Sequence, residues 1–429
     1  GPGMIVYKDV DKTVESIAQY SAEDAQRYRD IYDGFLEIKD GVIANMFTPP
    51  GPPSMLASVM ENSKEGLEML RNYRLSPKAF TKENFKNPHV QAFILGWAMA
   101  PQLWPFQEGG GQSFYVMIPA IHYFGESIPK GGTDALPLAL AKYIEAHNGK
   151  VMTNASVAKF IVSGNECKGI RLDDGREFSA GTAVVTSLDP RQTFTKLVDE
   201  EHLSAHFKRM VDNFSFGKVS IVRAHYALDE APQFKNGADM SKTPFQRIFG
   251  TMEDIEEQYA EMGRNKPPRN PFLWTACWTT KDPSRAPDGK HTLIMETFVS
   301  NRLPGGGLWT DELAKEYIEE VMLPKLQEYT TNMGHDNILG EYIDHAVSLE
   351  KDNLSLVDGT TTGGERTMAQ TGYFRPFPGY SQYRTPIKKL WMTGPSTHPG
   401  GAITAMGTVT AVEMLKSFGM REEEDEFDF

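Results

Sequence analysis

The sequence predicts an α/β fold, with two strongly patterned segments and a larger region of mixed helices and strands between them. A helical segment near residue 135 leads into short β-like segments, and a buried apolar strand follows at 183–187. A second buried strand, at 390–393, runs through a glycine-rich loop into a final helix. Strands that are apolar along their length are typical of parallel sheets covered on both faces.

The composition is that of a globular protein and excludes several functions. The 429 residues are 40% hydrophobic and 24% charged, enough for two domains. Forty-four Lys and Arg against 57 Asp and Glu give a net charge of −13, which would repel nucleic acid. Cys167 and Cys277 form no CxxC pair, so we expect neither a disulfide framework nor a thiolate metal site.

Targeting signals are not evident in the sequence. No segment reaches the roughly 18–20 consecutive apolar residues of a membrane-spanning helix, and residues 90–99 are too short. Residues 1–3 resemble the remnant of a cleaved tag ahead of a natural start at Met4, and no signal peptide follows. We therefore expect a cytoplasmic protein, with the acidic run at 421–426 as a solvated tail.

Residues 4–127 are expected to be mostly helical. Ser21 is placed to cap a helix, and apolar residues follow at the spacing of one helix face: Tyr28, Ile31, Tyr32 and Phe35. The aromatic-rich segment 93–124 has two interpretations, core packing and the lining of an apolar ligand cavity, and the density of large side chains favours the core.

Residues 128–190 change to a helix followed by strands. A glycine turn at 129–134 leads into a helix that presents one apolar face, made of Leu136, Leu140, Tyr143 and Ile144. Short strands are expected after it at 150–153, 156–162, 167–172, 176–178 and 183–187. Residues 191–385 are expected to form a second, mixed domain, with strands at 219–226, 272–279 and 292–299 and an amphipathic helix at 312–329.

The end of the chain has the form of a ligand site. A strand, a glycine-rich loop and a helix from Ala402 place unpaired N–H groups and the positive end of a helix dipole together. Gly400 and Gly401 would let the backbone approach a ligand closely. The alternative is that these glycines serve only the geometry of a tight turn.

Other chemistries lack support in the sequence. The glycine runs at 109–111 and 305–307 continue into neither GxGxxG nor a P-loop. His202 and His206 are spaced to share a helix face, but no third ligand accompanies them, so no metal is expected. No GxSxG is present for a hydrolase nucleophile.

In two blocks the sequence resembles the phytoene desaturase and pyridine nucleotide-disulfide oxidoreductase domain-containing protein 2-like family, FAD flavoproteins related to the amine oxidases. The central block comprises residues 128–132, the following helix, 151–157, the hairpin ending at 173–175, and 183–190. The C-terminal block comprises residues 374–376, 390–394 and 397–401. Residues 21–25 also resemble the segment that follows the first Rossmann portion in these proteins.

The resemblance implies a discontinuous FAD-binding domain of the glutathione-reductase type, made of residues 128–190 and 386–418 and incomplete at its N-terminus. Residues 4–127 and 191–385 would form the substrate domain, with a tail at 419–429. The resemblance places Gly131 and Gly132 near FAD and the Val157 backbone at its adenine end. It places these residues near the flavin: Gly394, Gly400, Gly401, Ala402, Ile403 and Thr404. The helix from Ala402 would aim its positive end at the N1/O2 edge of the flavin ring.

The chain departs from this family at its beginning. Family members start with a βαβ unit of roughly a hundred residues that carries GxGxxG and binds pyrophosphate, and this sequence starts after it. One explanation is a split enzyme whose small Rossmann-type subunit carries GxGxxG; the persistence of the flavin-facing glycines favours it. The other is a flavin-free remnant that acts as a binding or scaffold protein.

The expected function is that of an FAD-dependent oxidoreductase subunit, active with its partner chain, that transfers hydride from an apolar or aromatic small molecule to flavin. It would act as a desaturase, dehydrogenase or oxidase. His398, in the flavin-proximal loop, is the candidate base, and Arg375 is the candidate anchor for an anionic substrate or the flavin. The alternatives are a loop hydrogen bond for His398 and an ion pair near the surface for Arg375. The sequence leaves the substrate and the electron acceptor open.

Overall fold

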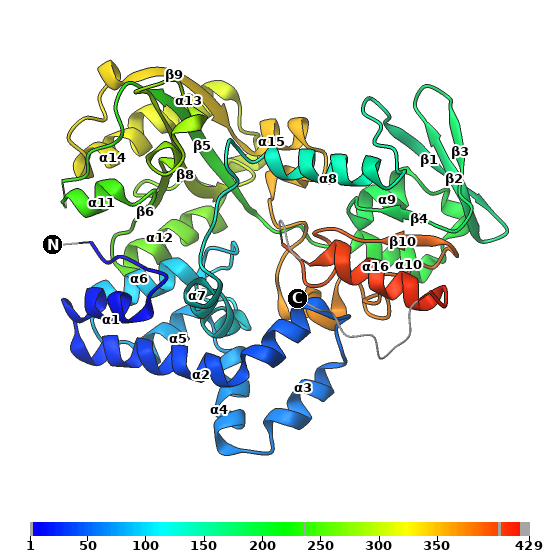
Figure 1. The fold of residues 1–429 in the computed structure, drawn as a ribbon, viewed down its shortest axis with the longest axis horizontal. Coiled ribbons are helices and arrows are strands. Elements are labelled where there is room, and N and C mark those ends of the chain that lie inside the picture. The colour runs from blue at the N-terminus through cyan, green and yellow to red at the C-terminus, as the bar shows by residue number, and fades with distance from the viewer. Residues whose placement is uncertain (1–2, 236, 402–404, 421–429) are drawn as a thin grey trace.

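The computed structural model describes residues 3–235, 237–401 and 405–420, which form two lobes (Figure 1). One lobe holds a five-stranded sheet with the N-terminal helices beside it. The other holds two small sheets and the C-terminal helix α16 (Met406–Ser417), and helix α8 (Ala135–Ala146) runs between the lobes.

Seven helices build the N-terminal part of the chain. They are α1 (Val10–Ala18), α2 (Ala22–Phe47), α3 (Pro53–Met60), α4 (Lys64–Arg74), α5 (Pro77–Asn84), α6 (Pro88–Ala98) and α7 (Ser113–Phe124). The Ser21 side chain accepts a hydrogen bond from the Asp24 N–H at the start of α2, as expected. The Asp24 carboxylate accepts bonds from the backbone of Lys86 and Asn87, at 2.9 and 2.8 Å, and so ties α2 to the start of α6.

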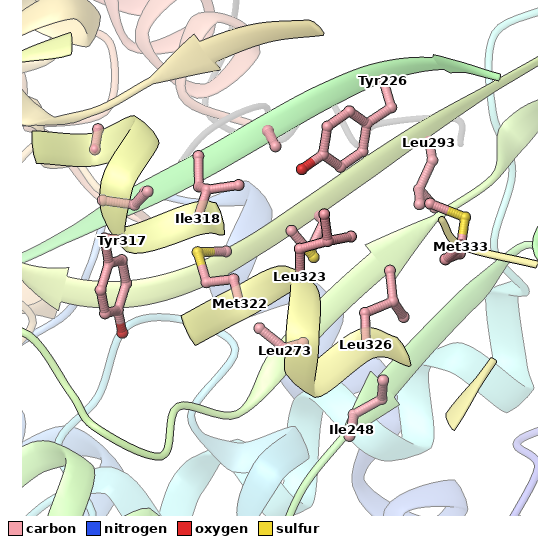
Figure 2. Packing of buried hydrophobic residues seen from close by; sticks show 14 of the residues in the cluster. Tyr226, Ile248, Leu273, Leu293, Tyr317, Ile318, Met322, Leu323, Leu326 and Met333 are labelled. Carbon is pink, nitrogen blue, oxygen red and sulfur yellow. The ribbon is translucent and has the colours of Figure 1, made fainter. Parts of the chain in front are cut away.

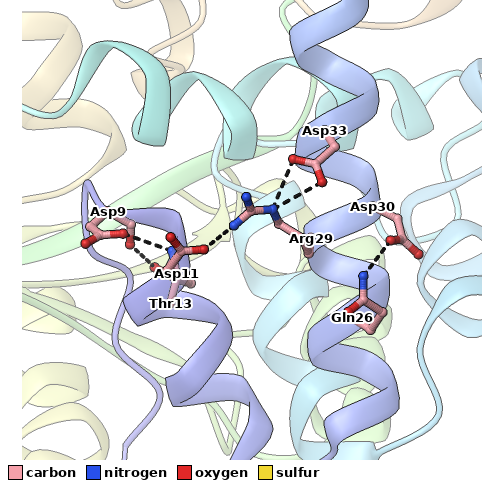
Figure 3. Close-up of polar contacts among 7 residues, drawn as sticks. All are labelled: Asp9, Asp11, Thr13, Gln26, Arg29, Asp30 and Asp33. Atoms are coloured by element: carbon pink, nitrogen blue, oxygen red, sulfur yellow. Dashed lines mark hydrogen bonds and ion pairs between the residues drawn. The ribbon is translucent and has the colours of Figure 1, made fainter.

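Polar contacts on the surface orient α1 against α2 (Figure 3). Asp9 caps α1 by accepting a bond from the Asp11 N–H at 3.0 Å. The Arg29 guanidinium of α2 contacts the Asp11 carboxylate of α1 and, at 3.0 Å, the Asp33 carboxylate one turn along. Because these carboxylates are exposed, such pairs contribute about 0–1 kcal/mol each.

An antiparallel sheet of strand order β6-β7-β8-β5-β9 forms the centre of the larger lobe. Its strands are β5 (Val219–Leu228), β6 (Phe245–Ile248), β7 (Leu273–Ala276), β8 (His291–Ser300) and β9 (Ile338–Asp344). The predicted strands at 219–226, 272–279 and 292–299 are confirmed with shifted ends. The sheet is therefore built wholly from the segment between the two predicted FAD blocks.

Helices cover both faces of this sheet. On one face Tyr226 and Leu293 pack against a continuous helix made of α13 (Asp311–Tyr317), a π-helical turn (Ile318–Met322) and α14 (Leu323–Tyr329) (Figure 2). On the other face Phe298 packs with side chains of α6 and α12 (Met252–Gly263). Among the shorter helices, α11 (Ala238–Lys242) and α15 (Ala346–Asp352) lie near this sheet, whereas α9 (Pro190–Lys196) and α10 (Ala205–Asp212) pack in the smaller lobe.

The smaller lobe contains a meander and a two-stranded parallel sheet. The meander consists of β1 (Val157–Ser163), β2 (Glu166–Leu172) and β3 (Glu177–Ser179), paired antiparallel in that order. In the parallel sheet β4 (Val184–Thr186) pairs with β10 (Leu390–Met392), with Val185 opposite Trp391. The two distant segments thus meet in one sheet, as the family resemblance implies.

One local prediction differs from the structure, and another lies outside the described residues. No strand forms at 150–153, and Val151 is exposed. A strand requires a neighbour to accept and donate its ladder hydrogen bonds, and no backbone bond joins this segment to a described strand. The predicted start of the last helix, Ala402, lies outside the described residues, and α16 is described from Met406.

Candidate functional site

The two parallel strands end side by side, and the loops that follow them form the centre of the candidate site. Ligands of open parallel sheets bind outside the carboxyl ends of the strands. Gly394 follows β10 with a φ of +91°, and a Cβ at this position would lie 2.8 Å from the Ser187 carbonyl oxygen that follows β4. Glycine is therefore required for the two strand ends to approach this closely.

The loop after β10 folds back on itself toward α16. The N–H and the hydroxyl of Thr397 both donate to the Gly394 carbonyl oxygen, each at 2.9 Å. Gly400 and Gly401 have φ of +81° and +96°, which suits residues without a Cβ. The remaining predicted flavin contacts, Ala402, Ile403 and Thr404, lie outside the described residues.

Arg375 is buried beneath this loop, with 1% of its surface exposed. Its guanidinium donates to the backbone carbonyl of Pro395 at 2.7 Å and to carbonyls of two other segments, those of Thr362, Gly363, Gly364, Glu365 and Gln370. Burial, with Arg366 adding a smaller effect, lowers the pKa of Arg375 to about 9. The alternative of an ion pair near the surface is wrong, because the bonded groups are buried carbonyls. The proposed substrate or flavin anchor remains a prediction.

His398 lies in the same loop and is 5% exposed. Its Nε2 is 2.9 Å from the Asn45 carbonyl of α2. Because a carbonyl oxygen can only accept, Nε2 carries the proton and Nδ1 is the acceptor nitrogen. Burial, supported by the nearby Arg375, lowers the pKa of His398, so the ring is neutral near pH 7. The contacts fit the loop-holding alternative, and the base role remains a prediction.

A second cluster holds the glycine turn that precedes α8. The Gly131 N–H donates to the Asp282 carboxylate at 2.7 Å, and Arg285 Nε donates to the same oxygen at 3.0 Å. The Ser284 hydroxyl, the Gly131 N–H and Arg285 together lower the pKa of Asp282 to about 2. Gly131 has a φ of +87°, and a Cβ there would meet no atom within 4 Å. Asp282 therefore holds the turn through the Gly131 N–H, and the space into which a Gly131 Cβ would point is open.

The structure thus groups some predicted site residues and not others. Arg375 and Gly400 are close together, since a Cβ on Gly400 would lie 3.0 Å from Arg375 Nε. Gly131 belongs with Asp282 and Arg285, while Gly132, with a φ of +144°, continues the same turn. Val157 begins β1, opposite Leu172. Asp282 was not predicted, because 151 positions separate it from Gly131 and no local pattern marks the contact.

The loop residues that follow β4 and β10 fit the flavin end of FAD. The glycine-rich loop at the ends of β4 and β10 offers close backbone approach to a flat ring. The sequence contains no GxGxxG turn for the pyrophosphate. Within the described ranges no group of three His, Cys, Asp or Glu could hold a metal ion. Of the helices described, none has the length and apolar character needed to cross a membrane.

Comparisons with known proteins agree with this geometry. The family described as flavin containing amine oxidoreductase matches residues 25–404. A limonene dehydrogenase subunit from Castellaniella defragrans is 27% identical, over 97% of this chain and 78% of that protein. Pyridine nucleotide-disulfide oxidoreductase domain-containing protein 2 of Rattus norvegicus is 26% identical, over 65% of this chain. Phytoene desaturase (lycopene-forming) of Pantoea ananas is 24% identical, over 68% of this chain. The matched regions span 48% and 56% of the last two proteins.

Solved structures show the same fold at low sequence identity. An oxidoreductase from Methanosarcina mazei has a TM-score of 0.52 at 18% identity, covering 83% of this chain and 72% of that one. A triple mutant of putrescine oxidase has a TM-score of 0.52 at 13% identity, covering 94% of this chain and 76% of that one. The chain therefore belongs to the flavin containing amine oxidoreductases, which confirms the resemblance found in the sequence and the expected FAD cofactor.

Proposed function

We propose that this protein is the substrate-binding subunit of an FAD-dependent desaturase, dehydrogenase or oxidase, and that a second, small polypeptide supplies the βαβ unit that binds the FAD pyrophosphate. The enzyme would transfer hydride from an apolar or aromatic small molecule to flavin. The observation that carries the proposal is an open sheet edge accompanied by an uncovered apolar helix in the same predicted FAD block, residues 128–190.

The open edge belongs to β4. This strand pairs with β10 on one side and, among the strands of the described ranges, with none on the other. Val185, in the middle of β4, is 46% exposed. An unpaired strand edge is a template for another strand, and parallel strands are normally covered on both faces. The edge is therefore suited to accept the strand of a βαβ unit.

The uncovered helix is α8, which has no buried residue. The apolar face expected to pack, made of Leu136, Leu140, Tyr143 and Ile144, is instead exposed in this structure. A contiguous apolar surface of this kind marks an interaction site. A second chain that paired with β4 and covered α8 would bury both features.

The names of the relatives support the partner and the substrate class. The protein from Castellaniella defragrans is named as one subunit of limonene dehydrogenase, which supports a multi-subunit enzyme. Limonene and phytoene, named in two relatives, are hydrocarbons, which supports an apolar substrate. Neither name assigns the substrate of this chain.

FAD, when bound, supplies the hydride acceptor. The residues of this chain would then hold the substrate side of the site. Gly394 and Gly400 would allow close approach of the backbone to the ring, and Arg375 would fix the loop that carries them through its carbonyl bonds. His398, neutral and with Nδ1 as its acceptor nitrogen, would take a proton at that atom where the substrate releases one.

Co-expression with a small chain that carries GxGxxG tests the proposal. Native mass spectrometry and an absorbance spectrum should show a two-chain complex with a flavin band. Leu140→Asp on α8 should abolish the complex, and the matched control Leu354→Asp, at an exposed leucine elsewhere, should retain it. A lone, colourless chain that also fails to take up added FAD would contradict the proposal and support the flavin-free alternative.

A further inference from the structure

Arg247 on β6 is enclosed by aromatic rings from three elements. Its Cζ lies 3.5 Å from the centre of the Trp97 ring, 4.7 Å from that of Trp274 and 5.1 Å from that of Phe245. The nitrogens Nε and Nη1 are out of contact with solvent and have no hydrogen-bond partner in the described structure. Ring faces attract a cation but do not replace the oxygen acceptors that its N–H groups have in water.

Arg247 is the first residue of a row that crosses the whole sheet. The strand register places Arg247 opposite Trp274, Trp274 opposite Glu296, Glu296 opposite Arg223, and Arg223 opposite Asp344. Residues directly opposite each other in an antiparallel sheet point to the same face. The row therefore places two arginines on one face of the sheet.

The two arginines of the row differ in their partners. Arg223 is bound to the Glu296 carboxylate at 2.6 and 2.7 Å and lies 3.7 Å from that of Asp344. The carboxylates that face Arg247 are those of Glu126 and Glu296, and neither makes a hydrogen bond or ion pair with it in the described structure. Arg247 Nε and Nη1 thus have no acceptor among the described residues, whereas Arg223 in the same row is paired with Glu296.

An unsatisfied donor of a second residue lies in the same place. The Trp274 indole N–H is also buried without a partner, and its ring lies against the Arg247 guanidinium. Buried charges and donors of this kind are normally paired, because leaving them unpaired costs stability. Arg247, Trp97 and Phe245 each retain partial exposure, so part of this cluster borders the solvent.

We propose that Arg247, Trp97 and Trp274 form a binding site for the carboxylate of a small organic acid with an apolar body. A carboxylate matches the planar guanidinium and accepts from more than one of its N–H groups. The apolar body would pack against the aromatic rings that surround the cation. The site lies in the substrate domain and its occupancy does not require FAD.

Titration of the full chain with benzoate, without FAD, tests this proposal separately from the proposed function. Calorimetry should show benzoate binding to the wild type and a higher Tm in its presence. Arg247→Met should weaken benzoate binding by about tenfold or more, as expected for the loss of a charged hydrogen bond. Without benzoate the same variant should keep or raise its Tm, because no bonded partner is lost.

Two comparisons make the result specific. Benzamide, with the same shape and no charge, should bind more weakly than benzoate. Arg223→Lys, at the paired arginine of the same row, should bind benzoate like the wild type. Absence of benzoate binding, equal affinity for benzamide, or an Arg247→Met variant that binds benzoate normally and loses Tm would each overturn the proposal.

Discussion

Two of the three sheets in the described structure, the five-stranded sheet and the two-stranded parallel sheet, differ in how they are closed. The β5–β9 sheet is covered on both faces, by α13 and α14 on one side and by α6 and α12 on the other. The β4–β10 sheet has two strands, and β4 has an open edge among the described strands. Its exposed Val185 contrasts with Val222 of β5, which is fully buried.

The open edge of β4 is accompanied by the exposed apolar face of α8. The inner strands of the larger sheet are paired on both sides and packed within this chain, while its outer strands β6 and β9 each have an edge without a partner among the described strands. Both β4 and α8 belong to the predicted FAD block at 128–190. The open edge and the exposed helix face therefore support the proposal that a second chain completes the smaller parallel sheet.

The largest expected effect comes from a matched pair of leucines. Leu326→Ala in the core of the β5–β9 sheet should lower the free energy of unfolding by about 2–5 kcal/mol, because it leaves a cavity. Leu140→Ala on α8 should change it by no more than about 0.5 kcal/mol, because this side chain is exposed. Urea denaturation measures the unfolding free energy of both variants. Losses of similar size would contradict the expected difference between the buried and the exposed leucine.

Arg375→Met should have the next largest effect, about 2–3 kcal/mol of unfolding free energy, since buried carbonyls lose a charged donor. The same variant should lose flavin from the two-chain complex, because the 394–401 loop loses its link to residues 362–365. Denaturation and flavin absorbance check the two effects. Unchanged stability would show that the carbonyls do not depend on this guanidinium.

Asp282→Asn should have a smaller effect that depends on pH. The pKa of Asp282 is about 2, below the value near 3.9 of an unfolded aspartate, so its stabilisation is present above pH 4 and lost as the pH falls toward 2. The difference in Tm between wild type and variant should therefore be largest at pH 7 and shrink below pH 4. A difference that stays constant over this range would show that the carboxylate charge does not hold the Gly131 turn.

Local patterns in the sequence predicted the secondary structure best. The β1–β3 meander is confirmed because each turn carries residues suited to positive φ, such as Asn165 and Gly175. The strand predicted at 150–153 is wrong, because strand formation depends on a neighbour that a local pattern does not reveal. The helix predicted near residue 135 forms at 135–146, but the sequence pattern alone did not reveal that its apolar face would be exposed.

Long-range contacts of the site could not be predicted in the same way. The carbonyls that bind Arg375 come from residues 362–365, 370 and 395, and only the folded chain brings them together. The Asp282 bond to Gly131 and the aromatic enclosure of Arg247 likewise join distant elements. Motif resemblance located the glycine-rich loop because its conformational requirement is local, as the φ of +91° at Gly394 shows.

Hydrogen–deuterium exchange of the chain, alone and with a small GxGxxG chain and FAD, tests the central claim most directly. In the isolated chain the amides of β4 and α8 should exchange faster than those of β5, which is paired on both sides. In the flavin-containing complex β4 and α8 should become protected while β5 stays unchanged. Protection of β4 and α8 equal to that of β5 in the isolated chain, or no change in the complex, would contradict the account.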